Sequence, residues 1–238
     1  MNILIVYAHP EPKSFNGALK DAAVEELQSQ GHTVRISDLY RANFKAIADR
    51  GDFDQQSNPD FFKYQAEQAH ASKEHGFHPE IQAELDRLFW ADFVIFQFPL
   101  WWYSVPAILK GWFDRVFAAG TIYGGGLGRY SEGALRGRKA MLSVTVGSAE
   151  SGFSPTGIDG DMTTILYHIN HGMLYFSGMQ PAEPYITYQP ARASADERKA
   201  MLASFKQHMK AIDDIPLIQY HPNDHFDENH QLKPEHRI

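Results

Sequence analysis

The sequence predicts an α/β protein in which helices cover both faces of a doubly wound parallel sheet of five strands, ordered 2-1-3-4-5. Unbroken apolar runs at residues 3–7 and 93–96 are typical of strands buried on both faces of a parallel sheet. A loop and a helical apolar pattern follow each run, which indicates parallel strands joined by right-handed crossovers. A chain of 238 residues can bury such a core without disulfides or metals.

The first strand, residues 3–7, is followed by a loop at 8–16 and a helical pattern through residues 18–27. Gly31 is well placed to end that helix, because glycine readily adopts the left-handed conformation found after a helix. A short second strand is expected at residues 34–36. Together these elements form the first βαβ unit.

Residues 41–79 carry no strong apolar repeat, so we interpret them as an excursion from the sheet rather than a separate domain. The amphipathic pattern at residues 81–89 predicts a helix that leads into the third strand, residues 93–96. This strand is expected at the centre of the sheet.

Three consecutive aromatic residues, Trp101, Trp102 and Tyr103, follow the third strand and precede a helical pattern at residues 105–116. Loops after the carboxyl ends of parallel strands are where ligands bind in open α/β sheets. At least one ring is therefore expected to face a flat ligand. The alternative is that the rings pack under the next helix or form a protein interface.

The remainder of the chain predicts two more strands, two more helices and a tail. The expected elements are a glycine-rich loop at 118–137, a strand at 140–146, a helix at 161–172, a last strand region from 174–176 and 184–187, a final helix capped by Ser194, and a tail at 212–238. We expect one catalytic domain at residues 1–211, and a tail at 212–238 that packs on it or on a dimer partner.

The composition excludes several classes of function. Cysteine is absent, so thiolate metal sites and thiol nucleophiles are excluded. The 22 basic and 29 acidic residues give a net charge of −7, which argues against a nucleic-acid or anionic-membrane partner. No apolar run approaches the roughly 20 residues of a membrane-spanning helix, and the first residues lead directly into a strand rather than a signal peptide. A cytoplasmic protein without membrane insertion is expected.

In the predicted strand order, the loops at residues 8–16 and 99–104 meet. The first loop has no dinucleotide fingerprint, but Ser14, Asn16 and the free amides of a helix start can bind phosphate. His9 and Lys13 add donors of the right charge. The alternative is that Ser14 is simply a helix cap. An anion site beside an aromatic loop is suited to a flavin nucleotide.

Several segments resemble the NAD(P)H:quinone oxidoreductase family of DT-diaphorase type, including its relative that prefers dihydronicotinamide riboside. They are YAHPEPKSFNGAL, SDLY, ADFVIFQFPLWWYSVPAILKGWFDRVF, the turn after LSVT, GIDGDM and HGMLYFSG, and the similarity runs from residue 1 to about residue 208. The resemblance implies a flavodoxin-like homodimer with bound FAD, FMN being the alternative. It also implies a ping-pong reaction in which hydride passes from NADH, NADPH or a riboside analogue, through flavin N5, to a quinone or similar electrophile.

The resemblance also assigns individual residues. The residues that match cofactor contacts are His9, Ser14, Phe15, Asn16, Gly17, Ala18, Pro99, Leu100, Trp101, Trp102, Tyr103, Thr145, Val146, Gly147, Ser148, Phe153 and Arg198. The residues that match substrate contacts are Trp102, Tyr103, Tyr123 and Phe176, the last two closing the pocket of the partner subunit.

The chain departs from the family at two catalytic positions, where Phe153 and Asp159 replace a tyrosine and a histidine. A phenyl ring donates no hydrogen bond, and an ionised carboxylate opposes negative charge nearby. We therefore expect the backbone amides of Gly147 and Ser148 to stabilise the charge that develops on the reduced flavin.

No metal site is expected. His171 matches a metal ligand of the riboside-preferring relative, but Tyr175 and Leu217 stand where further ligands would be needed. The tail histidines, His221, His225, His230 and His236, are interpreted as solvated side chains.

A function from another class stays open at this point. Ancillary proteins of potassium-efflux systems also resemble this family, so the chain could be a flavoprotein regulatory subunit of a membrane transporter with weak reductase activity.

Overall fold

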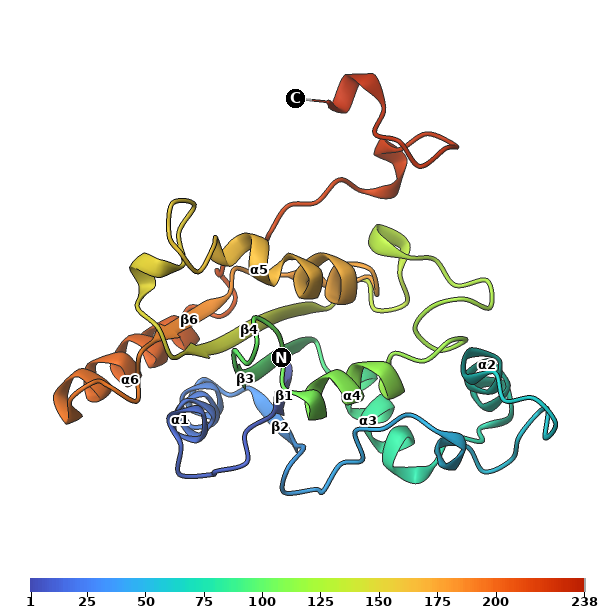
Figure 1. Cartoon of the computed structure of the whole chain (residues 1–238), viewed down its shortest axis with the longest axis horizontal. Helices are drawn as coiled ribbons and strands as arrows, with labels where there is room; N and C mark the ends of the chain where they lie inside the picture. The colour runs from blue at the N-terminus through green and yellow to red at the C-terminus, as the bar shows by residue number, and fades with distance from the viewer. Residues whose placement is uncertain (238) are drawn as a thin grey trace.

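The computed structural model describes residues 1–237 and confirms the flavodoxin-like fold (Figure 1). Its parallel sheet has the expected order β2-β1-β3-β4-β5, and β6 also pairs with β4. The strands are β1 (Asn2–Tyr7), β2 (Thr33–Asp38), β3 (Phe93–Pro99), β4 (Lys139–Val146), β5 (Gln180–Pro181) and β6 (Tyr185–Tyr188). Every residue of β3 is buried, as its unbroken apolar run predicts.

The fifth position of the sheet differs in detail from the expectation. Two short strands share it, because β5 pairs with the start of β4 and β6 pairs with its end. Residues 174–176, expected as strand, instead lie at the end of η4 (Asn170–Tyr175), a π-helical continuation of α5 (Met162–Ile169), and in the residue after it. A short apolar run does not distinguish a strand from a buried helical segment, which explains the error.

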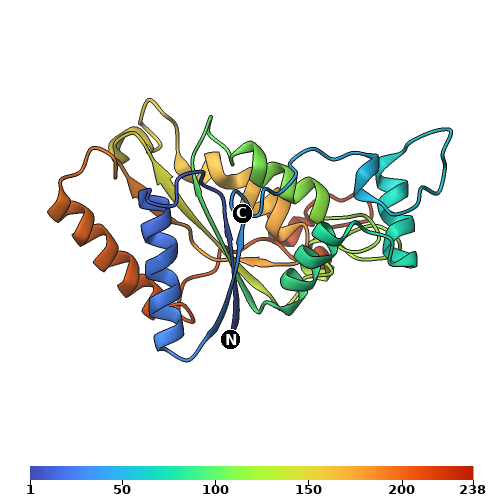
Figure 2. The same ribbon diagram turned by 90° about the horizontal axis from the view of Figure 1, so that it is seen from below.

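Helices cover both faces of the sheet (Figure 2). One face carries α1 (Phe15–Ser29) and α6 (Ala195–Lys210), and the other carries α3 (Pro79–Trp90), α4 (Ala107–Val116) and α5. Alternate residues of β1 face the two cores: Ile3 and Ile5 pack with α1 and α6, whereas Leu4 and Val6 pack with the other helices.

The helix cap expected at Ser194 is present, since Ser194 forms a capping box with Glu197, and Ser14 caps α1.

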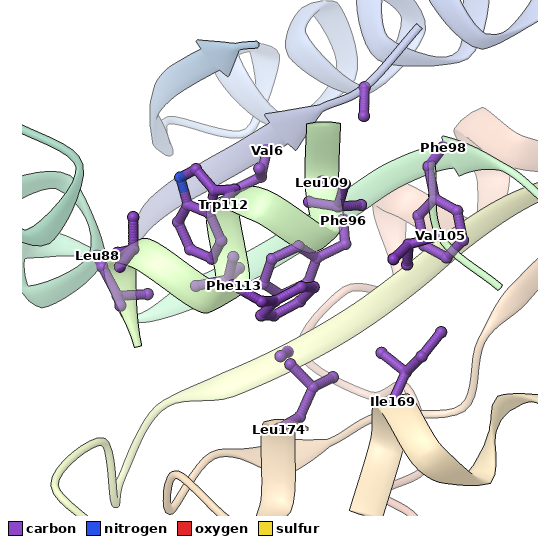
Figure 3. Close-up of a cluster of buried hydrophobic side chains, with 14 of the residues drawn as sticks. Val6, Leu88, Phe96, Phe98, Val105, Leu109, Trp112, Phe113, Ile169 and Leu174 are labelled. Carbon is purple, nitrogen blue, oxygen red and sulfur yellow. The ribbon is translucent and has the colours of Figure 1, made fainter. Parts of the chain in front are cut away.

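The aromatic side chains of α4 fill the larger core. Figure 3 shows Leu109, Trp112 and Phe113 facing Phe96 of β3. The Phe96 ring lies edge-on to Trp112, with centroids 5.7 Å apart, and 5.0 Å from Phe113. This packing fixes α4, and with it the end of the aromatic loop that precedes α4.

The excursion at residues 41–79 contains α2 (Tyr64–Glu74) and is tied to α4 by a buried ion pair. The Arg115 Nη2 atom lies 2.9 Å from Asp52 Oδ1, and both side chains are at most 1% exposed. Phe53 and Phe77 form an isolated antiparallel bridge within the excursion, and both belong to the larger core. The excursion is therefore part of the main fold.

The chain after α6 first packs on the domain and then leaves it (Figure 1). Ile212 and Ile215 are buried against the α1 and α6 side. Further on, the Asn223 amide nitrogen donates to Ser131 Oγ at 2.9 Å, and Tyr175 donates to the His221 carbonyl at 2.9 Å. The division into a domain at 1–211 and a tail at 212–238 stays a prediction.

Short helical turns complete the description: η1 (Arg50–Asp52), η2 (Tyr130–Glu132), η3 (Glu150–Gly152), η5 (Asn223–His225) and η6 (Pro234–His236). None of the helices within residues 1–237 combines the length and apolar character needed to span a membrane.

Candidate active site

A pocket of about 870 Å³ lies at the carboxyl edge of the sheet, where the loops after β1, β3 and β4 converge. Its position agrees with the rule that open parallel sheets bind ligands where the strand order reverses. The expected cofactor residues that line it are His9, Ser14, Phe15, Asn16, Ala18, Pro99, Leu100, Trp101, Thr145, Val146, Gly147 and Arg198.

A buried chain of hydrogen bonds fixes the three loops relative to one another. Gln97 of β3 donates to Asn16 Oδ1, and the Asn16 amide donates to Thr145 Oγ1 of β4, both at 2.8 Å. All three side chains are buried, so breaking either bond would leave an unpaired polar group in the core. The shape of the pocket is therefore set before any ligand arrives.

The start of α1 supplies free donors to this pocket. Ser14 Oγ accepts the Gly17 amide at 3.2 Å, so Ser14 is a helix cap, as the alternative interpretation held. The Phe15 and Asn16 amides make no hydrogen bond within residues 1–237. Capping and anion binding are therefore compatible here, because two first-turn amides and the positive end of the helix dipole stay available.

Basic side chains surround the same opening: His9, Lys13, Arg198 and Lys199. The His9 Nδ1 atom lies 3.0 Å from the Glu11 backbone nitrogen and 3.1 Å from the Glu11 carbonyl oxygen, so the ring is held against its own loop. Arg198 and Lys199 lie in the first turns of α6, so a second helix start borders the pocket. An elongated anion would find donors at both ends.

The aromatic loop forms a tight turn. Trp101 and Ser104 exchange two backbone hydrogen bonds at 3.1 Å, and the residues between them, Trp102 and Tyr103, have φ values of 52° and 60°. Asparagine and glycine are the usual residues at such positions, since other side chains are strained in the left-handed region. The Trp102 side chain is 96% exposed and does not line the pocket.

The two unusual positions of the site lie beside this turn. Tyr103 donates to Asp159 Oδ1 at 3.1 Å, and this hydrogen bond raises the pKa of Tyr103. Phe153 is buried between the rings of Tyr103 and Tyr188, with centroids 6.2 and 6.0 Å away. Asp159 is therefore engaged with the turn rather than placed freely in the pocket.

Eight expected site residues do not line the pocket of their own chain: Gly17, Trp102, Tyr103, Tyr123, Ser148, Phe153, Asp159 and Phe176. Ser148 is exposed beside it, and Gly17 is enclosed, because a Cβ atom there would lie 2.0 Å from the Pro12 carbonyl oxygen. Tyr123 and Phe176 contact each other at 6.0 Å between ring centroids. Closure of a partner's pocket by this pair stays a prediction.

Known proteins share this architecture over most of its length. Residues 1–211 match the family with a flavodoxin-like fold. The chain is 47% identical to ribosyldihydronicotinamide dehydrogenase (quinone) of Mus musculus over 211 residues, which is 88% of this chain and 91% of that protein. It is 44% identical to NAD(P)H dehydrogenase (quinone) 1 of Cavia porcellus over 229 residues, which is 96% of this chain and 83% of that protein.

The chain belongs to the NAD(P)H:quinone oxidoreductase family. A solved structure from Klebsiella pneumoniae, named as a candidate quinone reductase, superposes with a TM-score of 0.94 and 38% identity, and covers 99% of this chain and 95% of that one. The expected family and the expected class of enzyme, an oxidoreductase, are confirmed.

Sequence reasoning missed part of the wall of this pocket. Pro190, Ala191, Ala195, Lys199 and Leu202 line it from the start of α6 and the segment before it. The signal was present in the capping sequence at Ser194, which marks a helix start after a strand and thus at the carboxyl edge.

The metal position of the riboside-preferring relative has a different role here. His171 stacks on Tyr167, with ring centroids 4.8 Å apart, and Leu217 pairs with Ala182 in an isolated bridge. Burial lowers the pKa of His171. In the part of the chain that the structure describes, no group of three His, Cys, Asp or Glu side chains is arranged to hold a metal ion.

Proposed function

We propose that this protein is an FAD-dependent two-electron reductase that uses a reduced nicotinamide to reduce quinones or similar electrophiles by a ping-pong mechanism. The observation that carries the proposal is the preformed pocket that joins a helix start, basic side chains and an aromatic loop at the edge of β1, β3 and β4. When bound, the flavin supplies the hydride chemistry through N5, and the protein binds, orients and polarises the reactants.

The residues present fit a flavin dinucleotide. The free amides of Phe15 and Asn16, with Ser14 and His9, suit the pyrophosphate. The residues after β3 and β4 suit the edge of the isoalloxazine ring. Arg198 and Lys199 line the pocket from the α6 side. The single phosphate of FMN, bound at α1, would not need these two basic side chains, so their presence favours FAD over FMN.

The amides of Gly147 and Ser148 are the proposed donors to charge on the reduced ring. A Cβ atom built on Gly147 would meet nothing within 4 Å, so the space beside this backbone is open. Phe153 donates no hydrogen bond, and Asp159 is held by Tyr103. Backbone donors are fixed in place, and preorganised donors of this kind stabilise charge well.

We propose that the working unit is a homodimer with an active site at each interface. Tyr123 and Phe176 are absent from the pocket of their own chain, so this pair is available as an aromatic cover for the pocket of a partner. Closure by the partner's aromatic pair would provide that cover and place a substrate ring between it and Trp102. The cytoplasmic location expected from the sequence belongs to the same proposal.

The test begins with the purified protein, from which the cofactor is extracted and identified. Stopped-flow bleaching with NADH, NADPH and a dihydronicotinamide riboside then measures the reductive half-reaction. We expect FAD and rapid bleaching with at least one donor, followed by reoxidation with menadione. A protein that remains yellow with all three donors would instead support the ancillary-subunit function, and a colourless protein that takes up no flavin would refute both.

Replacement of one arginine tests the binding geometry. Arg198→Gln should weaken FAD binding about tenfold or more, because a charge-assisted contact is lost. FMN binding should change little, since FMN lacks the adenosine half. The matched control is Arg192→Gln, at an exposed arginine outside the pocket. Equal affinity of both variants for FAD would remove Arg198 from the site.

A further inference from the structure

The turn that carries the aromatic residues after β3 has a strained backbone. Trp102 and Tyr103 have φ values of 52° and 60°, although bulky side chains disfavour the left-handed region. Such strain persists only where the surrounding structure fixes the backbone, and it is concentrated at functional sites. The contacts around the turn therefore indicate what holds it in place.

Two residues of the turn are linked to other loops. The rings of Trp101 and His9 have centroids 6.3 Å apart, so the turn meets the loop after β1. Tyr103 donates to Asp159 Oδ1 at 3.1 Å, which joins the turn to the loop before α5. Both loops lie far from the turn in the sequence, so the tertiary fold determines its position.

The last residue of the turn is linked to α5. Ser104 Oγ lies 3.1 Å from His168 Nε2, and the other ring nitrogen, Nδ1, lies 2.9 Å from the Ile165 carbonyl oxygen. A carbonyl oxygen only accepts hydrogen bonds, so Nδ1 carries the proton of the neutral ring. The Nε2 atom is then left to accept from the Ser104 hydroxyl. The Ile165 carbonyl thus orients the imidazole toward the turn.

The helix α5 is a rigid support for this contact. Leu166 and Ile169, close to His168 in the helix, are fully buried in the larger core, and Figure 3 shows Ile169 there. The His168 side chain itself is exposed and adds nothing to that core. The contact with Ser104 is therefore the role that the structure gives to this imidazole.

Trp102 differs from the three residues that are linked to other parts of the chain. Its side chain is 96% exposed and does not line the pocket of its own chain. The links at Trp101, Tyr103 and Ser104 fix the backbone on both sides of this indole. An indole on a fixed backbone can stack on a planar ring at little cost in conformational entropy.

We propose that His168 is a positioning residue of the reductase: through Ser104 it holds the turn, and with it the Trp102 indole, in place for the ring of the electron acceptor. The inference rests on the proposed function, because it takes the acceptor ring to bind against Trp102. It adds a histidine that acts on acceptor affinity through another residue. The effect should be larger for a bicyclic quinone than for a monocyclic one, since the larger ring covers more of the indole.

The experiment measures acceptor binding without turnover, by isothermal titration calorimetry of menadione with the full-length, oxidised protein saturated with FAD. Trp102→Ala should weaken menadione binding about fivefold, because a stacked aromatic pair is lost. His168→Ala and Ser104→Ala should each weaken it about threefold with an unchanged melting temperature, because each removes the same hydrogen bond. Monocyclic tetramethylbenzoquinone should show smaller changes. Thr164→Ala, at an exposed side chain one turn earlier in α5, is the matched control and should bind menadione as the wild type does.

A double variant separates positioning from an independent effect. If His168 acts by placing Trp102, the combination of Trp102→Ala with His168→Ala should bind menadione as weakly as Trp102→Ala alone, because no indole remains to be placed. Losses that add in the double variant would overturn the proposal. Wild-type affinity of His168→Ala, Ser104→Ala or Trp102→Ala would overturn it as well.

A second measurement needs neither flavin nor acceptor. Long-range proton–nitrogen correlation spectra, recorded where the imidazole is neutral and assigned by comparison with His168→Ala, should show His168 as the Nδ1–H tautomer, and the Nε2–H tautomer would overturn the geometry. Flavin bleaching by the donors tests the reductase separately. A protein that no donor bleaches would refute the proposed function, whereas the menadione affinities would still decide the role of His168.

Discussion

Asp52→Asn should destabilise the protein strongly, although residue 52 lies in the excursion that the sequence left without a clear role. Asp52 is fully buried and accepts bonds from Arg115 Nε at 3.1 Å and Nη2 at 2.9 Å, and from the Tyr64 hydroxyl at 2.7 Å. Burial, followed by the bond to Asp52, raises the pKa of Tyr64, so this hydroxyl stays a donor. In an asparagine side chain, an NH2 group replaces one of the two carboxylate oxygens, so one of these donors would face another donor.

The magnitude follows from what remains around Arg115. Removing one partner of a buried ion pair costs about 3–5 kcal/mol, because the other charge stays buried. Arg115 keeps the Glu80 carboxylate at 2.6 Å, so we expect the lower end, about 3 kcal/mol. For a chain of this length such a loss lowers the melting temperature by about 6–12 °C.

Equilibrium unfolding in urea, followed by circular dichroism with FAD held constant, measures the free energy of unfolding. Glu80→Gln is the comparison variant. The Glu80 side chain is 26% exposed, so this substitution should lower the free energy of unfolding by only about 1 kcal/mol. Asp54→Asn, at an exposed carboxylate two residues away, should stay within about 0.5 kcal/mol of wild type. An Asp52→Asn loss no larger than that of Glu80→Gln would refute the reasoning.

Three further predictions concern the site and its surroundings. Gly17→Ala should lower both stability, by about 1–3 kcal/mol, and FAD affinity, because the added Cβ meets the Pro12 carbonyl oxygen at 2.0 Å; thermal unfolding and flavin titration measure the two effects. Asp159→Ala should change the rate of flavin reduction by NADH in stopped flow, since it frees the Tyr103 hydroxyl beside the pocket. Burial lowers the pKa of His208 in the folded protein, so below about pH 6.5 the unfolded state binds more protons than the folded state. The free energy of unfolding should therefore fall as the pH drops from 7 to 5. In urea unfolding, His208→Phe should reduce that fall.

Each of these predictions has a matched comparison. Gly172→Ala should be tolerated, because a Cβ atom there meets nothing within 4 Å. Tyr103→Phe removes the same hydrogen bond from the other side, so a reduction rate unchanged in both Tyr103→Phe and Asp159→Ala would exclude the pair from the reductive half-reaction. A pH profile of unfolding that is identical in wild type and His208→Phe would show that this histidine does not contribute.

The sheet could be predicted from the sequence because its strands are buried on both faces. In β1 and β3 this burial leaves apolar runs that polar residues hardly interrupt, and α1, which follows β1, carries a readable cap at Ser14. The fifth position was harder, since β5 has two residues and its pairing with β4 depends on tertiary packing. The π-helical η4 gave no signal distinct from an ordinary helix or strand.

The same distinction between regular elements and loops applies to the candidate site. Residues at strand ends, such as Thr145, and at the first helix start, such as Asn16, could be placed because the strand order brings them together. The Tyr103–Asp159 bond could not, because it joins two loops 56 residues apart whose conformations no local pattern determines. Their pairing nevertheless explains how an aspartate is accommodated where the family has a histidine: the turn that carries Trp102 supplies its donor.

The tail at residues 212–238 has a structural role that its composition hides. Residues 212–238 are rich in polar and proline residues, which is typical of an irregular segment. The Tyr175 hydroxyl of η4, however, donates to the His221 carbonyl at 2.9 Å and so ties the tail to the domain. The Tyr220 ring also packs against Tyr175, with ring centroids 4.9 Å apart. The order in the tail therefore depends on the apolar face it covers, so Tyr220→Ala and Tyr175→Phe should both increase proteolytic cleavage after residue 217, whereas Gln219→Ala should not.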